Sequence, residues 1–163
     1  MRLCKIGLSE DATCRVCGLE EEGFRHLFFL CVRLKSFKSM MEKVVNGFLC
    51  NSAECPVWEE LLIFGFSGKT TNSFALNLFL AVARYAIFQR RAIVRQRGKP
   101  LPLCAFFKRR LTYFVGILHD YFYTAGETER FWNMVGFNNP FIVYQWSGYD
   151  ICLPQCEGNT VGE

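Results

Sequence analysis

Aspartate and histidine are scarce in this chain, and their scarcity limits the chemistry that it can carry out. Among 163 residues there are three aspartates, Asp11, Asp120 and Asp150, and two histidines, His26 and His119. A polymerase needs paired aspartates for two-metal chemistry, and no two of these aspartates are neighbours in the sequence. The spacing of the two histidines from the cysteines matches no catalytic triad. We therefore expect no enzyme activity.

Long apolar runs and export signals are also missing. The longest apolar run, Phe74–Phe88, has fifteen residues and is interrupted by Asn77 and Arg84. A membrane-spanning helix needs about 20 apolar residues. The N-terminal residues lack the apolar stretch and the cleavage site of a signal peptide. We expect an intracellular protein, in the nucleus or the cytoplasm, without a membrane partner.

Acidic residues are absent between Glu60 and Asp120. Ten Lys or Arg lie in that interval, so it carries +10 while the rest of the chain carries −6, which together give the net charge of +4. A basic middle of this kind is predicted to face an anion such as the backbone of RNA or DNA, although a solvated helix face is the alternative. The residues predicted to contact phosphates are Arg84, Arg90, Arg91, Arg95, Arg97, Lys99, Lys108, Arg109 and Arg110.

Part of this basic region forms a stripe on a predicted helix. Asn77, Arg84, Arg91 and Arg95 lie within about 40° of one another at helical periodicity. Aromatic side chains are interleaved with the cations and would stack on unpaired bases if they were exposed, whereas core packing is the alternative. These aromatic residues are Tyr85, Phe106, Phe107 and Tyr113.

Cysteine, in contrast, is plentiful, with nine residues. Four potential metal ligands follow the pattern Cys14-x2-Cys17-x8-His26-x4-Cys31, and Cys3His is a common ligand set for structural zinc. Such a site would have no open position for catalysis. The alternative is three buried thiols and a core histidine. A regular α-helix would place His26 and Cys31 about 140° apart, so the site requires that the helix open or begin after His26.

The remaining cysteines give weaker patterns. Cys50, Cys55, Cys152 and Cys156 could form a second metal site, but no histidine lies near them. Cys4 and Cys104 are predicted to be isolated thiols. Because we expect a reducing compartment, we expect no disulfide framework.

The hydrophobic periodicity predicts a mainly α protein. Helical patterns begin near Leu27 and cover Phe74–Arg97, Leu103–Thr124 and Glu127–Val135, whereas Phe141–Trp146 is rich in β-prone residues. We expect a small zinc-stapled loop-helix module followed by a helical bundle, with a short extended C-terminal segment. The corresponding divisions are 1–49 (the zinc-binding loop and an amphipathic helix), 50–135 (a helical region with a basic middle) and 136–163 (an extended segment and a frayed tail).

The segment GLSEDATCRVCGLEEEGFRHLFFLC, Gly7–Cys31, resembles the zinc-binding segment that follows the reverse transcriptase domain in LINE-type (non-LTR) retrotransposon polyproteins. A later region is more loosely similar to the helical tail of the same polyproteins. It runs from LNLFLAVARYAIFQRR, Leu76–Arg91, through FFKRRL, Phe106–Leu111. The resemblance implies zinc ligation by Cys14, Cys17, His26 and Cys31, and a role in binding RNA or DNA. It does not carry over polymerase activity, because the paired aspartates are missing.

These observations predict a zinc-binding, nucleic-acid-binding module from the C-terminal end of a retrotransposon reverse transcriptase. The alternative is a protein-interaction or oligomerisation module that packs on a partner, or on a second copy of itself, through Phe74–Phe88. Salt dependence separates the two, because phosphate binding weakens steeply with added salt.

Overall fold

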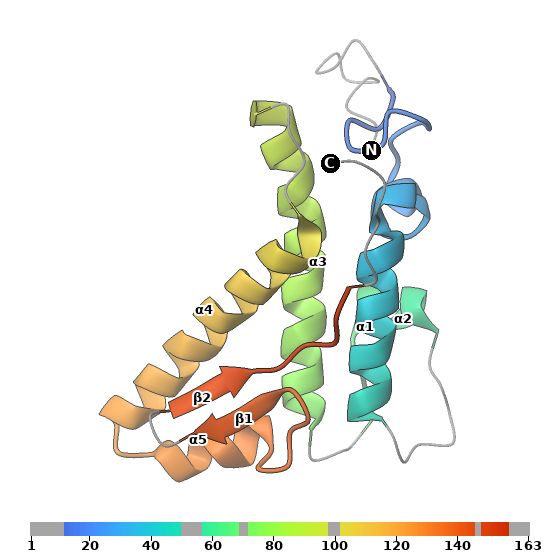
Figure 1. Cartoon of the computed structure of the whole chain (residues 1–163). Helices are drawn as coiled ribbons and strands as arrows, with labels where there is room; N and C mark the ends of the chain where they lie inside the picture. Colours follow the sequence, from blue (N-terminus) through green and yellow to red (C-terminus); the bar gives the residue numbers. More distant parts are fainter. Residues whose placement is uncertain (1–11, 50–56, 69–71, 98–101, 146–147, 157–163) are drawn as a thin grey trace.

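The computed structural model describes residues 12–49, 57–68, 72–97, 102–145 and 148–156, and the fold is mainly α, as predicted (Figure 1). Within these residues, the N-terminal loop leads into two short helical turns and then into five α-helices and a two-stranded antiparallel sheet. The elements are η2 (π-helix, His26–Leu30), η3 (3-10 helix, Val32–Leu34), α1 (Lys35–Phe48), α2 (Trp58–Phe64), α3 (Ser73–Arg97), α4 (Leu103–Thr124), α5 (Thr128–Val135), β1 (Ile142–Gln145) and β2 (Gly148–Ile151).

Helix α3 is the central element, with α4 on one side of it and α1 on the other (Figure 1). It packs against α2, α4, α5 and η2. A helix that is apolar nearly all round must be buried, and most apolar side chains of Phe74–Phe88 are in the core. The chain's own core therefore covers the face that the alternative hypothesis assigned to a partner. Within that run the exposed residues are Phe74 and Phe88 at its ends and the small Ala81 between them.

Aromatic rings link α3 to its neighbours. Phe79 of α3 is fully buried and lies 5.1 Å from the Phe48 ring of α1 and 6.3 Å from the Phe107 ring of α4, measured between ring centroids. Phe141, just before β1, packs on Phe48 and Phe79. One contiguous core therefore runs from Cys14 to Ile151. The segments 1–49, 50–135 and 136–163 all contribute to this core.

The C-terminal segment is extended, as predicted, and forms the β1–β2 hairpin. The buried Asn139 holds the chain in place before β1: its amide nitrogen donates to the Val135 carbonyl at 2.7 Å, and its amide oxygen accepts from the backbone N–H groups of Phe141 and Ile142. The Tyr149 hydroxyl of β2 donates to the Thr112 carbonyl of α4 at 3.1 Å. These bonds fasten the hairpin to the helices.

The prediction that Cys104 is an isolated thiol is wrong. Cys104 at the start of α4 forms a disulfide with Cys156, whose sulfur lies 3.5 Å from Met40 Sδ of α1. Cys156 is therefore not free for a second metal site, and Cys152 is an exposed free thiol. Cys4, Cys50 and Cys55 lie outside the described residues. The helices among the described residues are not long and apolar enough to cross a membrane.

Replacement of Phe79 tests the central position of α3. We expect Phe79→Ala to lower the free energy of unfolding by about 3–5 kcal/mol, because it opens a cavity between α1, α3 and α4. Phe64→Ala is the control, since Phe64 is 83% exposed, and a change within about 0.5 kcal/mol is expected there. Denaturant unfolding measures both. Equal losses in the two variants would contradict the placement of α3 in the core.

Candidate metal centre

A π-turn brings the two ligand positions of the His26–Cys31 segment onto the same side. The Cys31 N–H donates to the His26 carbonyl at 2.9 Å, which is the i→i+5 bond of a π-helix. Residues joined by such a bond lie nearly above one another, so the angular separation expected for an α-helix does not arise. The turn ends at Cys31, where ψ is 122°, and η3 follows. The requirement for an opened helix is met by this change of helix type.

The Cys14–Cys17 pair lies in a tight loop that backbone hydrogen bonds close. The Gly18 N–H donates to the Cys14 carbonyl, and the Cys14 N–H donates to the Glu20 carbonyl, each at 2.7 Å. Gly18 has a φ of 70°, a left-handed conformation that glycine adopts without a Cβ penalty. The glycine directly after Cys17 therefore lets the chain turn back and bring both sulfur atoms to one side of the loop.

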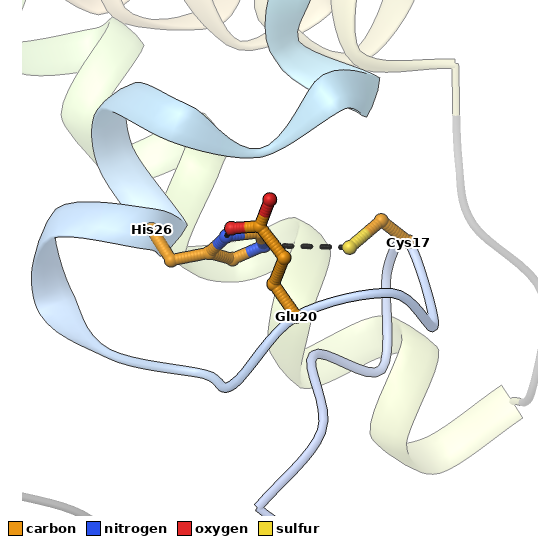
Figure 2. Close-up of polar contacts among 3 residues, drawn as sticks. All are labelled: Cys17, Glu20 and His26. Atoms are coloured by element: carbon orange, nitrogen blue, oxygen red, sulfur yellow. Dashed lines mark hydrogen bonds and ion pairs between the residues drawn. The ribbon is translucent and has the colours of Figure 1, made fainter.

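All four predicted ligands meet in one cluster. The sulfur atoms of the three cysteines and one ring nitrogen of His26 lie within 4.8 Å of one another. Cys14, Cys31 and His26 are buried and Cys17 is half-buried. Figure 2 shows Cys17 pointing towards the His26 ring, with its sulfur 3.3 Å from Nε2. Tetrahedral zinc has bonds of about 2.3 Å to sulfur and about 2.0 Å to nitrogen, so a small contraction of the cluster would suit such an ion.

Glu20 orients the histidine. Its Oε2 lies 2.9 Å from Nδ1 of His26, so the Nδ1–H donates to the carboxylate and Nε2 faces Cys17 (Figure 2). Metal-bound histidines commonly donate their second N–H in this way, and the bond fixes the tautomer. The ligand spacing alone does not identify this residue. The acidic run Glu20–Glu22 was its signal, but the pattern could not show which carboxylate faces the imidazole.

The three thiols differ in acidity. Burial raises the pKa of Cys14 and raises that of Cys31 to about 12. Partial burial acts upward on the pKa of Cys17, but hydrogen bonds from the backbone N–H groups of Leu19 and Glu20 and with the side chains of Cys14 and His26 together lower it to about 7. Thiolates are the form that binds a metal, so a bound cation would displace protons from Cys14 and Cys31.

The polar stripe of α3 contacts other parts of the chain. Asn77 makes two hydrogen bonds to the backbone of Phe66, at 2.8 and 2.9 Å, and Arg84 donates to the Ile63 carbonyl at 3.0 Å. Arg91 forms an ion pair with Glu22 in the loop of residues 14–23, which carries Cys14 and Cys17 and is the candidate metal-binding loop. The stripe therefore fastens α2 and the metal-binding loop to α3.

The predicted phosphate-contacting residues differ in their exposure. Arg90 is buried and donates to the carbonyl of Arg33, two residues after Cys31, and Arg110 lies over the rings of Tyr85 and Phe106 at 5.7 and 5.2 Å from their centroids. Among those whose side chains the structure describes, Lys108 and Arg109 are exposed. Neither Lys99 nor the side chains of Arg95 and Arg97 are among the described parts of the chain.

The predicted stacking aromatics also differ in exposure. Phe107 is fully buried in the core, as the alternative of core packing predicts, while Tyr85 and Phe106 are half-buried. Tyr113 is 56% exposed on α4, and Tyr121, two turns further on, is 68% exposed. Tyr121 was not predicted to stack on bases; it lies about 80° around the helix from Tyr113, on the adjoining part of the exposed surface.

Substitution of the ligands tests the metal centre. We expect the wild-type protein, purified without chelator, to contain one zinc ion per chain, and Cys14→Ser and His26→Ala to contain none, because each removes one of four ligands. Cys152→Ser is the matched control, since that thiol is free and exposed, and it should retain full zinc. Elemental analysis of the four proteins measures this. A wild-type protein that contains no zinc would refute the assignment of these residues as a zinc site.

Glu20→Gln tests the orienting bond. We expect zinc affinity to fall about tenfold to a hundredfold, because the His26 N–H loses its charged acceptor. Competition with a chromophoric chelator measures the affinity. Glu42→Gln on the exposed face of α1 removes the same charge at a distance and should leave it unchanged. Equal affinities for the two variants would refute the role of Glu20.

Comparison with known proteins adds no assignment: no family model, curated protein or solved structure matches the chain.

Proposed function

We propose that the protein is a zinc-binding, nucleic-acid-binding module, without polymerase activity, derived from the C-terminal end of a LINE-type reverse transcriptase. The observation that carries the proposal is the cluster of four zinc-type ligand atoms within 4.8 Å, assembled by a loop and a π-turn. The resemblance of Gly7–Cys31 to the zinc-binding segment of those polyproteins supports the proposed origin.

The proposed role of zinc is structural. Four protein ligands complete a tetrahedral sphere and leave no position for a reacting water. Structural zinc sites of this kind contribute about 10–16 kcal/mol of binding free energy at neutral pH, which is also folding free energy for a loop too small to bury a core. Zinc would hold the Cys14–Cys31 segment in one shape against α3.

The proposed nucleic-acid contact is the outer face of α4. Arg109, Tyr113, Ile117 and Tyr121 follow one another at four-residue intervals, and all four are exposed. Each step of four residues turns the helix by about 40°, so these residues form one exposed band that curves over about 120° of the helix surface. Lys108 adds a second exposed cation at the same end. Cations beside exposed aromatic rings are the combination that binds single strands, since phosphates pair with the former and bases stack on the latter.

Charge along this face favours one end of it. Lys108 and Arg109 lie in the first half of α4, whereas the exposed Asp120 lies next to Tyr121. We therefore place the phosphate contacts at the N-terminal end and base stacking from Tyr113 onward. Contacts of this type provide affinity without sequence information. The proposed ligand is single-stranded RNA or DNA of any sequence.

Salt dependence tests the proposal. We expect the log of the binding constant for a labelled single-stranded oligonucleotide to fall linearly with log salt, measured by fluorescence anisotropy. The double variant Lys108→Gln/Arg109→Gln should reduce the slope by about 1.4, because each phosphate contact to a single strand contributes about 0.7. Tyr113→Ala should lower the binding free energy by about 1–3 kcal/mol and leave the slope unchanged.

The control for this experiment removes the same charge from the other side of the molecule. Lys35→Gln/Lys43→Gln on α1 should leave the slope and the affinity near wild type, because α1 and α4 lie on opposite sides of α3 (Figure 1). A slope that responds equally to both double variants would contradict a specific α4 surface. Absence of any salt-sensitive binding would reject nucleic-acid binding altogether.

A further inference from the structure

Arg90 is a buried cation with too few partners. The residue is 8% exposed to solvent. One guanidinium nitrogen, Nη1, donates to the Arg33 carbonyl at 3.0 Å. The Nε atom is buried and has no hydrogen-bond partner among the described residues, and no described carboxylate forms an ion pair with Arg90. Burial of a charge without a counter-charge costs free energy, so a negative partner for Arg90 is expected nearby.

The adjacent arginine shows what is missing. Arg91 has its carboxylate, Glu22 of the metal-binding loop. Arg90 faces the same module, and Arg33, whose carbonyl it contacts, lies two residues after Cys31. Burial lowers the pKa of Arg90, while the nearby Cys31 and Cys14 sulfur atoms act in the opposite direction, as anions do. The cysteine sulfur atoms of the cluster are therefore the groups that would act as counter-charges to Arg90 once they are thiolates.

The charge of the metal centre supplies the missing counter-charge. A divalent ion bound by three thiolates and one neutral imidazole carries one net negative charge. Cys14, Cys31 and His26 are buried, so this charge would also be removed from water. A single buried guanidinium beside it gives a neutral pair, and its free N–H groups are donors of the kind that thiolate ligands accept.

We propose that Arg90 is the counter-ion of the metal centre: its guanidinium neutralises the Cys3His–metal unit and donates to its thiolates, so that metal loading and the docking of α3 strengthen each other. The inference rests on the proposed metal site. A simpler role, in which Arg90 only ties η3 to α3, makes a different prediction. That tie would stabilise the protein to the same extent with and without metal.

The test uses two variants that differ in charge. Arg90→Lys and Arg90→Gln can each donate a hydrogen bond to the Arg33 carbonyl, but only lysine keeps the positive charge. We expect Arg90→Gln to bind zinc about tenfold to a hundredfold more weakly than wild type, and Arg90→Lys to lie between the two. Arg84→Gln, which removes a charge from the same helix away from the cluster, should leave zinc affinity unchanged.

Two readouts separate the roles of Arg90. Competition with a chromophoric chelator gives the zinc affinity, and the thiolate-to-cobalt charge-transfer band of the Co²⁺-loaded protein reports hydrogen bonding to sulfur and should shift in Arg90→Gln. Zinc is titrated into the metal-free chain whether or not that chain is folded, so an unfolded variant still yields a result. Zinc uptake by Arg90→Lys but not by Arg90→Gln is the extreme form of the expected outcome.

Equal zinc affinities and equal cobalt spectra for Arg90→Lys and Arg90→Gln would overturn the proposal and leave the simple tie. A wild-type protein that binds no zinc would fail at an earlier step, since it would reject the metal site itself. The two negative outcomes are therefore distinguishable. If only the counter-ion role is wrong, the wild-type protein still binds zinc; if the metal site is wrong, the wild-type protein binds none.

Discussion

The hydrogen bond from the Cys31 N–H to the His26 carbonyl is the constraint on which the candidate site depends. It spans five residues instead of four and so places a histidine and a cysteine on the same side of the chain. Glu20 then fixes the ring so that Nε2 faces the sulfur atoms. A regular α-helix in this place would direct His26 away from Cys31 and leave three thiols without a fourth ligand.

The second organising feature is α3, which has both an apolar and a polar function in the fold. Its buried side chains form the centre of the core, and its polar stripe holds α2 through Arg84 and the candidate metal-binding loop through Arg91. Much of the positive charge in the middle of the sequence is therefore used within the molecule. The cations left on the described surface of this region, Lys108 and Arg109, lie on α4 beside exposed tyrosines.

Sequence patterns predicted the mainly α fold and the four residues of the candidate metal site, because helical periodicity and ligand spacing are local properties. They could not predict how the His26–Cys31 geometry is resolved, since the choice between α- and π-helix depends on the packing around the turn. The Cys104–Cys156 disulfide joins residues 52 apart, and spacing alone does not reveal such pairings. The burial of Arg90 was not predicted either, because a cation in a basic run has the same sequence pattern whether it lies on the surface or in the core.

X-ray absorption at the zinc edge, on the full chain loaded with one equivalent of zinc, tests the central claim most directly. The account predicts a four-coordinate ion with three sulfur neighbours at about 2.3 Å and one nitrogen neighbour at about 2.0–2.1 Å. A first shell dominated by oxygen, or one with fewer than three sulfur atoms, would contradict it, because the cluster would then not be the site at which the protein holds its metal.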